Sequence, residues 1–104
     1  MAIAEIIITP LGTGTPSLSK YVASAVKVLE QEKDLKYELT PMGTVVEGDL
    51  GKILLVAEKM HEACFDEGVS RVATTVKIDD RRDKTSTMKD KVNSVMRKLG
   101  HQGS

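Results

Sequence analysis

A short segment in the middle of the chain, residues 41–49, holds polar groups that core packing does not require. It places Thr44 and Glu47 on a very short apolar strand between glycines. A hydroxyl and a carboxylate pair with adjacent donors and acceptors on a ligand, and a carboxylate also favours a nearby cation. Thr44 and Glu47 therefore predict a small-molecule site. The alternative for Glu47 is a solvated charge or an ion pair with Lys77 or Arg81.

Two other segments supply further polar candidates. Ser17 and Ser19 stand in a loop after the first predicted strand, where they line a site or, more commonly for serine, cap the next helix. Lys77 belongs to the last predicted strand and is expected to border the site. Asp79 and Arg81 follow it, and we expect them to pair with each other or across an interface rather than to contact a ligand.

Motifs for catalysis, metals or cofactors do not emerge from the sequence. Neither His61 nor His101 has a cysteine or acidic neighbour at the spacing of a metal site, and a solvated or partly packed role is expected for His61. Residues 48–53 lack the spacing of a phosphate loop, and residues 12–16 lack the third glycine of a dinucleotide fingerprint. We therefore expect no catalytic residues, no metal site, no cofactor and no enzyme activity.

Composition restricts the classes of partner. Fifteen basic and fifteen acidic residues give a formal net charge of +0, and aromatic residues make up 3%, so neither electrostatic attraction nor base stacking favours nucleic acid. No apolar run approaches the roughly 20 residues of a membrane span, and no signal peptide is evident. The single cysteine, Cys64, excludes an internal disulfide and is expected to be buried. These features predict a cytoplasmic protein.

Hydrophobic periodicity sets the expected elements. Strands are predicted over residues 2–9, 36–40, 44–47 and 72–78, with Tyr37 and Leu39 pointing inward. Helices are predicted after Ser19, between Asp49 and Gly68, and over residues 88–99. The order is that of an α+β fold, a ferredoxin-like βαββαβ sandwich with an extra C-terminal helix. It forms one domain over residues 1–99, followed by a flexible tail, 100–104.

One face of this predicted sheet stays uncovered by the two helices of the βαββαβ unit. Ile3, Ile7 and Ala73 fall on that face, and several contiguous apolar residues there need a cover. Either a second subunit covers them, or the C-terminal helix folds back over them, and the two are not exclusive.

Four segments of the chain resemble a known family in order and spacing: residues 10–14, 19–23, 41–49 and 71–81. They are similar to the small thiamine-binding proteins related to the YkoF-type hydroxymethylpyrimidine-binding proteins, and the match runs from about Ile3 to about Val95. The resemblance implies a ferredoxin-like subunit of a homo-oligomer, a dimer of dimers, that binds thiamine or its hydroxymethylpyrimidine portion without catalysis.

Under this resemblance the ligand contacts are Thr44 and Glu47, with Ser17, Ser19 and Lys77 nearby. The chain contains no tryptophan, so stacking on the pyrimidine ring would have to come from Tyr21 or from a neighbouring subunit. The alternative function is a structural or regulatory oligomeric module that has no ligand.

Overall fold

The structure, a computed structural model, describes residues 1–14, 18–83 and 87–100. Ser17 and the tail residues 101–104, for which predictions were made, lie outside these ranges. The elements follow the predicted order β-α-β-β-α-β-α. They are β1 (Ala2–Leu11), α1 (Ser19–Glu30), β2 (Lys36–Thr40), β3 (Gly43–Gly48), α2 (Leu50–Phe65), β4 (Arg71–Asp80) and α3 (Met88–Lys98).

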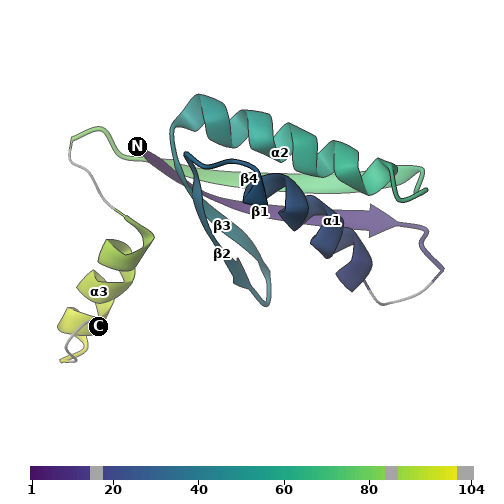
Figure 1. Cartoon of the computed structure of the whole chain (residues 1–104). Helices are drawn as coiled ribbons and strands as arrows, with labels where there is room; N and C mark the ends of the chain where they lie inside the picture. Colours follow the sequence, from purple (N-terminus) through teal and green to yellow (C-terminus); the bar gives the residue numbers. More distant parts are fainter. Residues whose placement is uncertain (15–17, 84–86, 101–104) are drawn as a thin grey trace.

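The four strands form one antiparallel sheet in the order β2-β3-β1-β4. Helices α1 and α2 lie side by side on one face of this sheet, which we call the helix face (Figure 1). The predicted α+β, ferredoxin-like fold with an added C-terminal helix is confirmed. No helix in the described ranges is long and apolar enough to cross a membrane.

The core lies between the helix face and the two helices. In β1 the alternate residues Ala2, Ala4 and Ile6 are almost completely buried, as strand periodicity requires when one face is covered. Val46 of β3 is registered with Ala4 and completes this layer. The helices contribute the opposite layer, which consists mainly of Ala25, Leu29, Ile53, Val56, Ala57 and Met60.

The helix boundaries follow local capping chemistry. Asp49 caps α2 as predicted, because its carboxylate accepts a hydrogen bond from the N–H of Lys52 at 3.2 Å. Ser19 is not a cap; it is the first residue of α1, and the residue at the cap position, Leu18, makes no side-chain capping bond. In α3, Thr87 and Asp90 form a reciprocal capping box, so this helix starts at a well-defined point.

Two apolar residues at predicted inward positions are exposed. Leu39 points to the helix face, since it is registered with Thr44, but it lies on the edge strand β2 and remains solvent-exposed. Leu54 of α2 follows Leu50 and precedes Ala57 at helical spacing, which predicts an inward position, but it is also exposed, whereas Val56 is buried. Helical spacing alone therefore does not determine which residues of α2 the sheet buries. Cys64 is buried, as expected.

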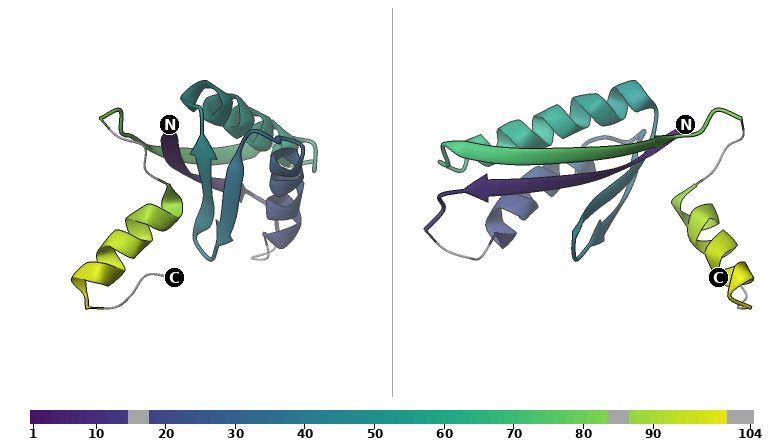
Figure 2. Two further views of the ribbon diagram at one scale, coloured as in Figure 1. Left: turned by 60° about the vertical axis from the view of Figure 1, so that its left-hand side comes forward. Right: turned by 180° about the vertical axis from the view of Figure 1, so that it is seen from behind.

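The second face of the sheet, here called the open face, carries Ile3 and Ile7 of β1 and alternate residues of β4, which are Arg71, Ala73, Thr75, Lys77 and Asp79. Helix α3 lies on this side, near the end of the sheet where the chain begins, and diverges from it (Figure 2). Within the described chain, α3 has no buried residue. The single chain therefore leaves most of its open face uncovered.

Candidate functional site

A cavity of about 290 Å³ opens between the start of α1 and the tip of the β2–β3 hairpin. We call it the hairpin pocket. Its volume lies just below the usual range for small-molecule sites, about 300–1,000 Å³. Several elements line it: Ile6 to Thr9 come from β1, Leu18, Val22, Ala25 and Val26 from the α1 region, Leu39 to Thr44 from the hairpin, and Met60 from α2.

The hairpin approaches β1 closely because residue 43 is glycine. A Cβ atom at Gly43 would lie 3.1 Å from the carbonyl oxygen of Ile6 and 3.1 Å from Cγ1 of Ile7. The turn itself is held by Thr40, whose hydroxyl donates to the carbonyl of Gly43 at 2.9 Å and accepts from the N–H of Met42 and of Gly43. The hydrogen-bonding capacity of Thr40 is thus used within the turn.

Thr44 differs from Thr40 in this respect. It is only 5% exposed, yet its hydroxyl makes no hydrogen bond to any residue in the described part of the chain. No buried side-chain oxygen or nitrogen there is both sealed from solvent and unpaired, so the Thr44 hydroxyl must reach open space. Because Thr44 lines the hairpin pocket, that space is the pocket. A ligand in the pocket would find this hydroxyl free to donate and accept.

The rest of the pocket is mainly apolar, with Thr9 and Thr40 as its other described hydroxyl-bearing residues. No charged side chain stands among its described lining residues. Three large apolar side chains on its lining, those of Val22, Leu39 and Met42, are exposed, Met42 by 77%. A concave apolar site with a few fixed polar groups is the usual form of a small-molecule pocket.

Glu47 lies on the opposite face of the sheet from Thr44. Thr44 is registered with Ile6 on the helix face, whereas Glu47 is registered with Ile3 on the open face. The two residues are three apart on one strand, and successive side chains of a strand alternate between faces. The structure therefore does not bring Thr44 and Glu47 into one pocket, and the prediction that they share a site is wrong in this respect.

The Glu47 carboxylate has a structural partner. Its Oε2 atom accepts a hydrogen bond of 2.9 Å from the backbone N–H of Met88, the first residue of α3. Glu47 is 5% exposed, so it is neither a solvated charge nor an ion pair with Lys77 or Arg81. The positive end of the dipole of α3 lies at this first turn, and it also stabilises the negative charge of the carboxylate. Glu47 thus fastens α3 to the sheet.

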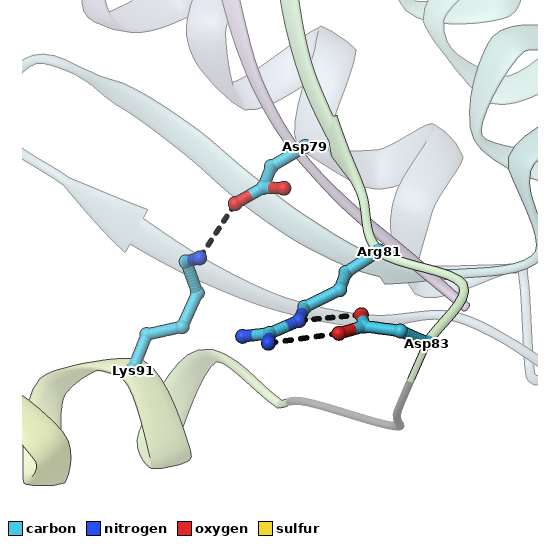
Figure 3. Close-up of polar contacts among 4 residues, drawn as sticks. All are labelled: Asp79, Arg81, Asp83 and Lys91. Carbon is cyan, nitrogen blue, oxygen red and sulfur yellow. Dashed lines mark hydrogen bonds and ion pairs between the residues drawn. The ribbon is translucent and has the colours of Figure 1, made fainter.

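Lys77, Asp79 and Arg81 are also on or beside the open face. Asp79 does not pair with Arg81: it accepts from Lys91 of α3 at 2.5 Å, while Arg81 forms a two-bond pair with Asp83 (Figure 3). The hydrogen bond and the charge of Lys91 lower the pKa of the Asp79 carboxyl. Lys77 is exposed, is registered with Glu5 on the open face, and is not among the residues that line the hairpin pocket.

The remaining predicted contacts do not gather at the hairpin pocket. Ser19 is exposed at the start of α1 and is not among the residues that line the pocket. Tyr21 is buried; its backbone carbonyl lies 3.9 Å from the thiol sulfur of Cys64, and the Lys20 ammonium lies over its ring. Tyr21 is therefore not placed to stack on a ligand in this pocket. Ser17 lies outside the described residues.

His61, for which a solvated or partly packed role was expected, packs against neighbouring side chains. Its Nδ1 atom lies 2.6 Å from the Thr74 hydroxyl, and its ring meets Phe65 edge to face. The described residues hold no group of three or more side chains suited to a metal ion.

Sequence reasoning missed the apolar part of the pocket. Leu39 and Met42 flank a turn at Pro41, and two large apolar residues at a hairpin tip are the signal that points to it. The contact between Glu47 and Met88 joins residues 41 positions apart, and nothing local in the sequence predicts it.

Comparison with known proteins gives a consistent family. The family model for thiamine-binding protein matches residues 4–96. The UPF0045 protein YqgV of Bacillus subtilis is 50% identical over 102 residues, which cover 95% of this chain and 98% of that protein. A UPF0045 protein of Staphylococcus xylosus is 44% identical over 107 residues, covering both chains fully.

Solved structures agree. The crystal structure of the Methanocaldococcus jannaschii protein MJ1052 has a TM-score of 0.83 and 42% identity, covering 90% of this chain and 94% of that one. A Thermotoga maritima protein named for thiamine biosynthesis/salvage has a TM-score of 0.74 over 90% of this chain and 97% of its own, and at 20% identity it shows a shared fold alone. The chain therefore belongs to the family of thiamine-binding proteins.

Proposed function

We propose that the protein binds thiamine, or its hydroxymethylpyrimidine portion, in the hairpin pocket, and that it does so as a homo-oligomer without catalysing a reaction. The observation that carries this proposal is the unpaired hydroxyl of the almost buried Thr44 in an apolar pocket. Family membership supports the choice of ligand.

The chemistry of the pocket suits the pyrimidine ring better than the thiazolium ring. A neutral aminopyrimidine presents adjacent donors and acceptors, and the Thr44 hydroxyl is able to pair with either kind of group. The thiazolium ring is a cation, and the described lining offers no carboxylate to balance it. Thiamine would therefore place its pyrimidine inside and leave its thiazolium towards solvent. Hydroxymethylpyrimidine and thiamine should then bind with similar affinity.

The absence of catalysis is part of the proposal. The hydroxyl of Thr44 has no histidine, lysine or carboxylate among the described residues that line its pocket, so no base is at hand to activate it as a nucleophile. We also place this binding activity in the cytoplasm, and we expect no nucleic acid or membrane partner.

Calorimetric titration of the whole protein with hydroxymethylpyrimidine and with thiamine tests the proposal. Thr44→Val keeps the side-chain shape and removes the hydroxyl. We expect it to weaken binding by about 0.5–1.5 kcal/mol, the typical net worth of one hydrogen bond, or roughly 2- to 12-fold. The same change should not lower the free energy of unfolding, because it removes an unpaired polar group.

Thr75→Val is the matched control. It makes the same chemical change on an exposed position of the open face and should leave affinity unchanged. Equal affinity in the parent and Thr44→Val proteins would exclude Thr44 as the recognition group. If the parent protein shows neither heat nor a thermal shift with millimolar concentrations of either compound, the ligand assignment fails.

A module that acts only through subunit contacts is the second candidate. One observation favours it: the open face and the apolar stripe of α3 are uncovered in the single chain. It becomes the better account if the parent protein assembles but binds neither compound.

A further inference from the structure

Helix α1 begins without the capping that side chains give to α2 and α3. Leu18, at its cap position, makes no side-chain capping bond, and the first turn contains no acidic residue. The first N–H group to bond within the helix start is that of Tyr21, so those of Ser19 and Lys20 have no acceptor among the described residues. Free N–H groups at the positive end of a helix dipole favour an anion.

The side-chain charge at this end of α1 has the same sign as the dipole. Lys20 stands in the first turn, where the positive end of the dipole disfavours a cation. Its ammonium lies 5.1 Å from the centroid of the Tyr21 ring and forms no ion pair with a carboxylate of the described residues. Glu67 accepts a hydrogen bond from Ser24, further along α1, but Ser24 does not line the hairpin pocket. The start of α1 is therefore positive and lacks a counter-ion in the described chain.

The start of α1 borders the same cavity as the unpaired hydroxyl of Thr44. Leu18 lines the hairpin pocket at the first turn of α1, and Thr44 lines it from the hairpin. In Figure 1 the start of α1 and the hairpin tip both point downwards. Thr44 is 5% exposed and makes no hydrogen bond within the described residues. Two independent features, a buried free hydroxyl and an uncapped helix start, thus face one ligand.

We propose that the preferred ligand of the hairpin pocket is a phosphate monoester of the pyrimidine, hydroxymethylpyrimidine phosphate. Its ring lies against Thr44, and its phosphate accepts hydrogen bonds from the N–H groups of Ser19 and Lys20. This inference rests on the proposed function and adds the charge of the ligand to it. The methylene carbon that carries the phosphate in this ester carries the thiazolium ring in thiamine. Thiamine therefore offers a cation where the ester offers an anion, and the start of α1 favours the anion.

Calorimetric titration of the full-length protein compares the ester with hydroxymethylpyrimidine and thiamine. We expect the ester to bind about tenfold or more tightly than either, because its phosphate gains charged hydrogen bonds. Thiamine phosphate carries its phosphate beyond the thiazolium ring and should show no such gain. If hydroxymethylpyrimidine binds and its ester binds no more tightly, or if thiamine phosphate gains equally, this inference is wrong while the proposed function stands. If none of these compounds binds, the proposed function fails as well.

Ser19→Asp tests the position of the phosphate. A carboxylate in the first turn of α1 stabilises the helix but repels a bound anion, so the free energy of unfolding should not fall. We expect the preference for the ester over hydroxymethylpyrimidine to drop roughly fivefold or more. Gln31→Glu is the matched control, since it adds the same charge at an exposed position at the other end of α1 and should keep the preference. An equal drop in both variants would overturn the placement, because net charge alone would explain it.

Backbone amide NMR spectra of the natural sequence locate the phosphate directly. The N–H signals of Ser19 and Lys20 should shift strongly with the ester and much less with hydroxymethylpyrimidine, whereas the signal of Thr44 should shift with both. Shifts specific to the ester at the basic residues of α3, Lys89 and Lys91, without a change at Ser19 and Lys20, would show that the phosphate binds outside the hairpin pocket and would refute the proposal.

Discussion

The two faces of the sheet are formed by the same strands but differ in how far helices of the chain cover them. On the helix face, Ile6 and its neighbours are buried by α1 and α2. The hairpin pocket is a small cavity at the edge of this core. On the open face, Ile3 is half-buried and the nearest helix, α3, is held at one end only. One face is completed by the chain itself, and the other stays largely uncovered in the single chain.

The position of polar groups follows from this difference. Thr44 and Glu47 are equally buried, at 5% exposure, but for opposite reasons. Thr44 is enclosed by the core and lacks a partner in the described chain, which is what a ligand contact needs. Glu47 is enclosed by α3 and already accepts a backbone N–H. Burial alone therefore does not identify a binding residue; its hydrogen bonds do.

The strongest test of this contrast makes one change on each face of β1. Ile6→Ala removes a fully buried side chain, and we expect it to lower the free energy of unfolding by about 2–5 kcal/mol. Ile3→Ala removes a half-buried one and should cost about 1 kcal/mol, given about 0.8 kcal/mol for each CH₂ group fully buried. Chemical denaturation monitored by circular dichroism measures both.

Repeating the denaturation at several protein concentrations separates the two variants further. The cost of Ile6→Ala should not depend on concentration, whereas the cost of Ile3→Ala should grow with concentration if copies of the chain assemble over the open face. Equal costs for the two variants at low concentration would mean that the two faces are equally closed within one chain.

The sequence predicted the fold well because its periodicities are strong. Strand alternation in residues 72–78 and helical spacing in residues 50–64 each set which side faces the core, and Asp49 marks a helix start. Exposure at the edges was not predictable in this way. Leu39 alternates onto the helix face as predicted, but it lies on the edge strand β2, where the helices do not cover it. How far the helices extend over the sheet depends on their packing.

The site was predicted less well, for a physical reason that strand geometry makes plain. Thr44 and Glu47 are close in sequence, which suggests one site, but an odd spacing on a strand separates side chains onto opposite faces. Strand parity by itself is therefore enough to exclude one shared pocket. The partners of Glu47 and Asp79 in α3 are not predictable from sequence, since they depend on where a distant helix docks.

A smaller effect is expected from cutting the link between the open face and α3. Glu47→Ala leaves the Met88 N–H without its acceptor, and hydrogen bonds to charged groups are typically worth about 1.5–3 kcal/mol. Hydrogen exchange at the first turn of α3 should accelerate correspondingly. Affinity for hydroxymethylpyrimidine should stay unchanged, because Glu47 faces away from the hairpin pocket.

Glu58→Ala on α2 serves as the control, since Glu58 is an exposed acidic residue away from both regions. A loss of ligand affinity in Glu47→Ala without a change in α3 exchange would reverse the assignment and restore Glu47 as a recognition group.

The smallest effect concerns pH and the second tether of α3, the pair of Asp79 and Lys91. Lys91 lowers the pKa of the Asp79 carboxyl in the folded protein below its unfolded value. The stabilisation is therefore present above the unfolded pKa and is lost as pH falls through the lower, folded pKa. Both side chains are about half exposed, so salt should screen the contact and its contribution to stability should be small.

Lys91→Met isolates this contribution, because it keeps the long side chain and removes the charge. NMR titration of the Asp79 carboxyl should then show its pKa rising towards the ordinary value for aspartate, and the protection of α3 from hydrogen exchange should lose part of its dependence on acid pH. Lys89→Met, two positions away on α3 and without an ion pair to Asp79, should leave the Asp79 pKa where it was. An Asp79 pKa that is the same in all three proteins would show that α3 is held at the open face by Glu47 and apolar contacts, without help from this pair.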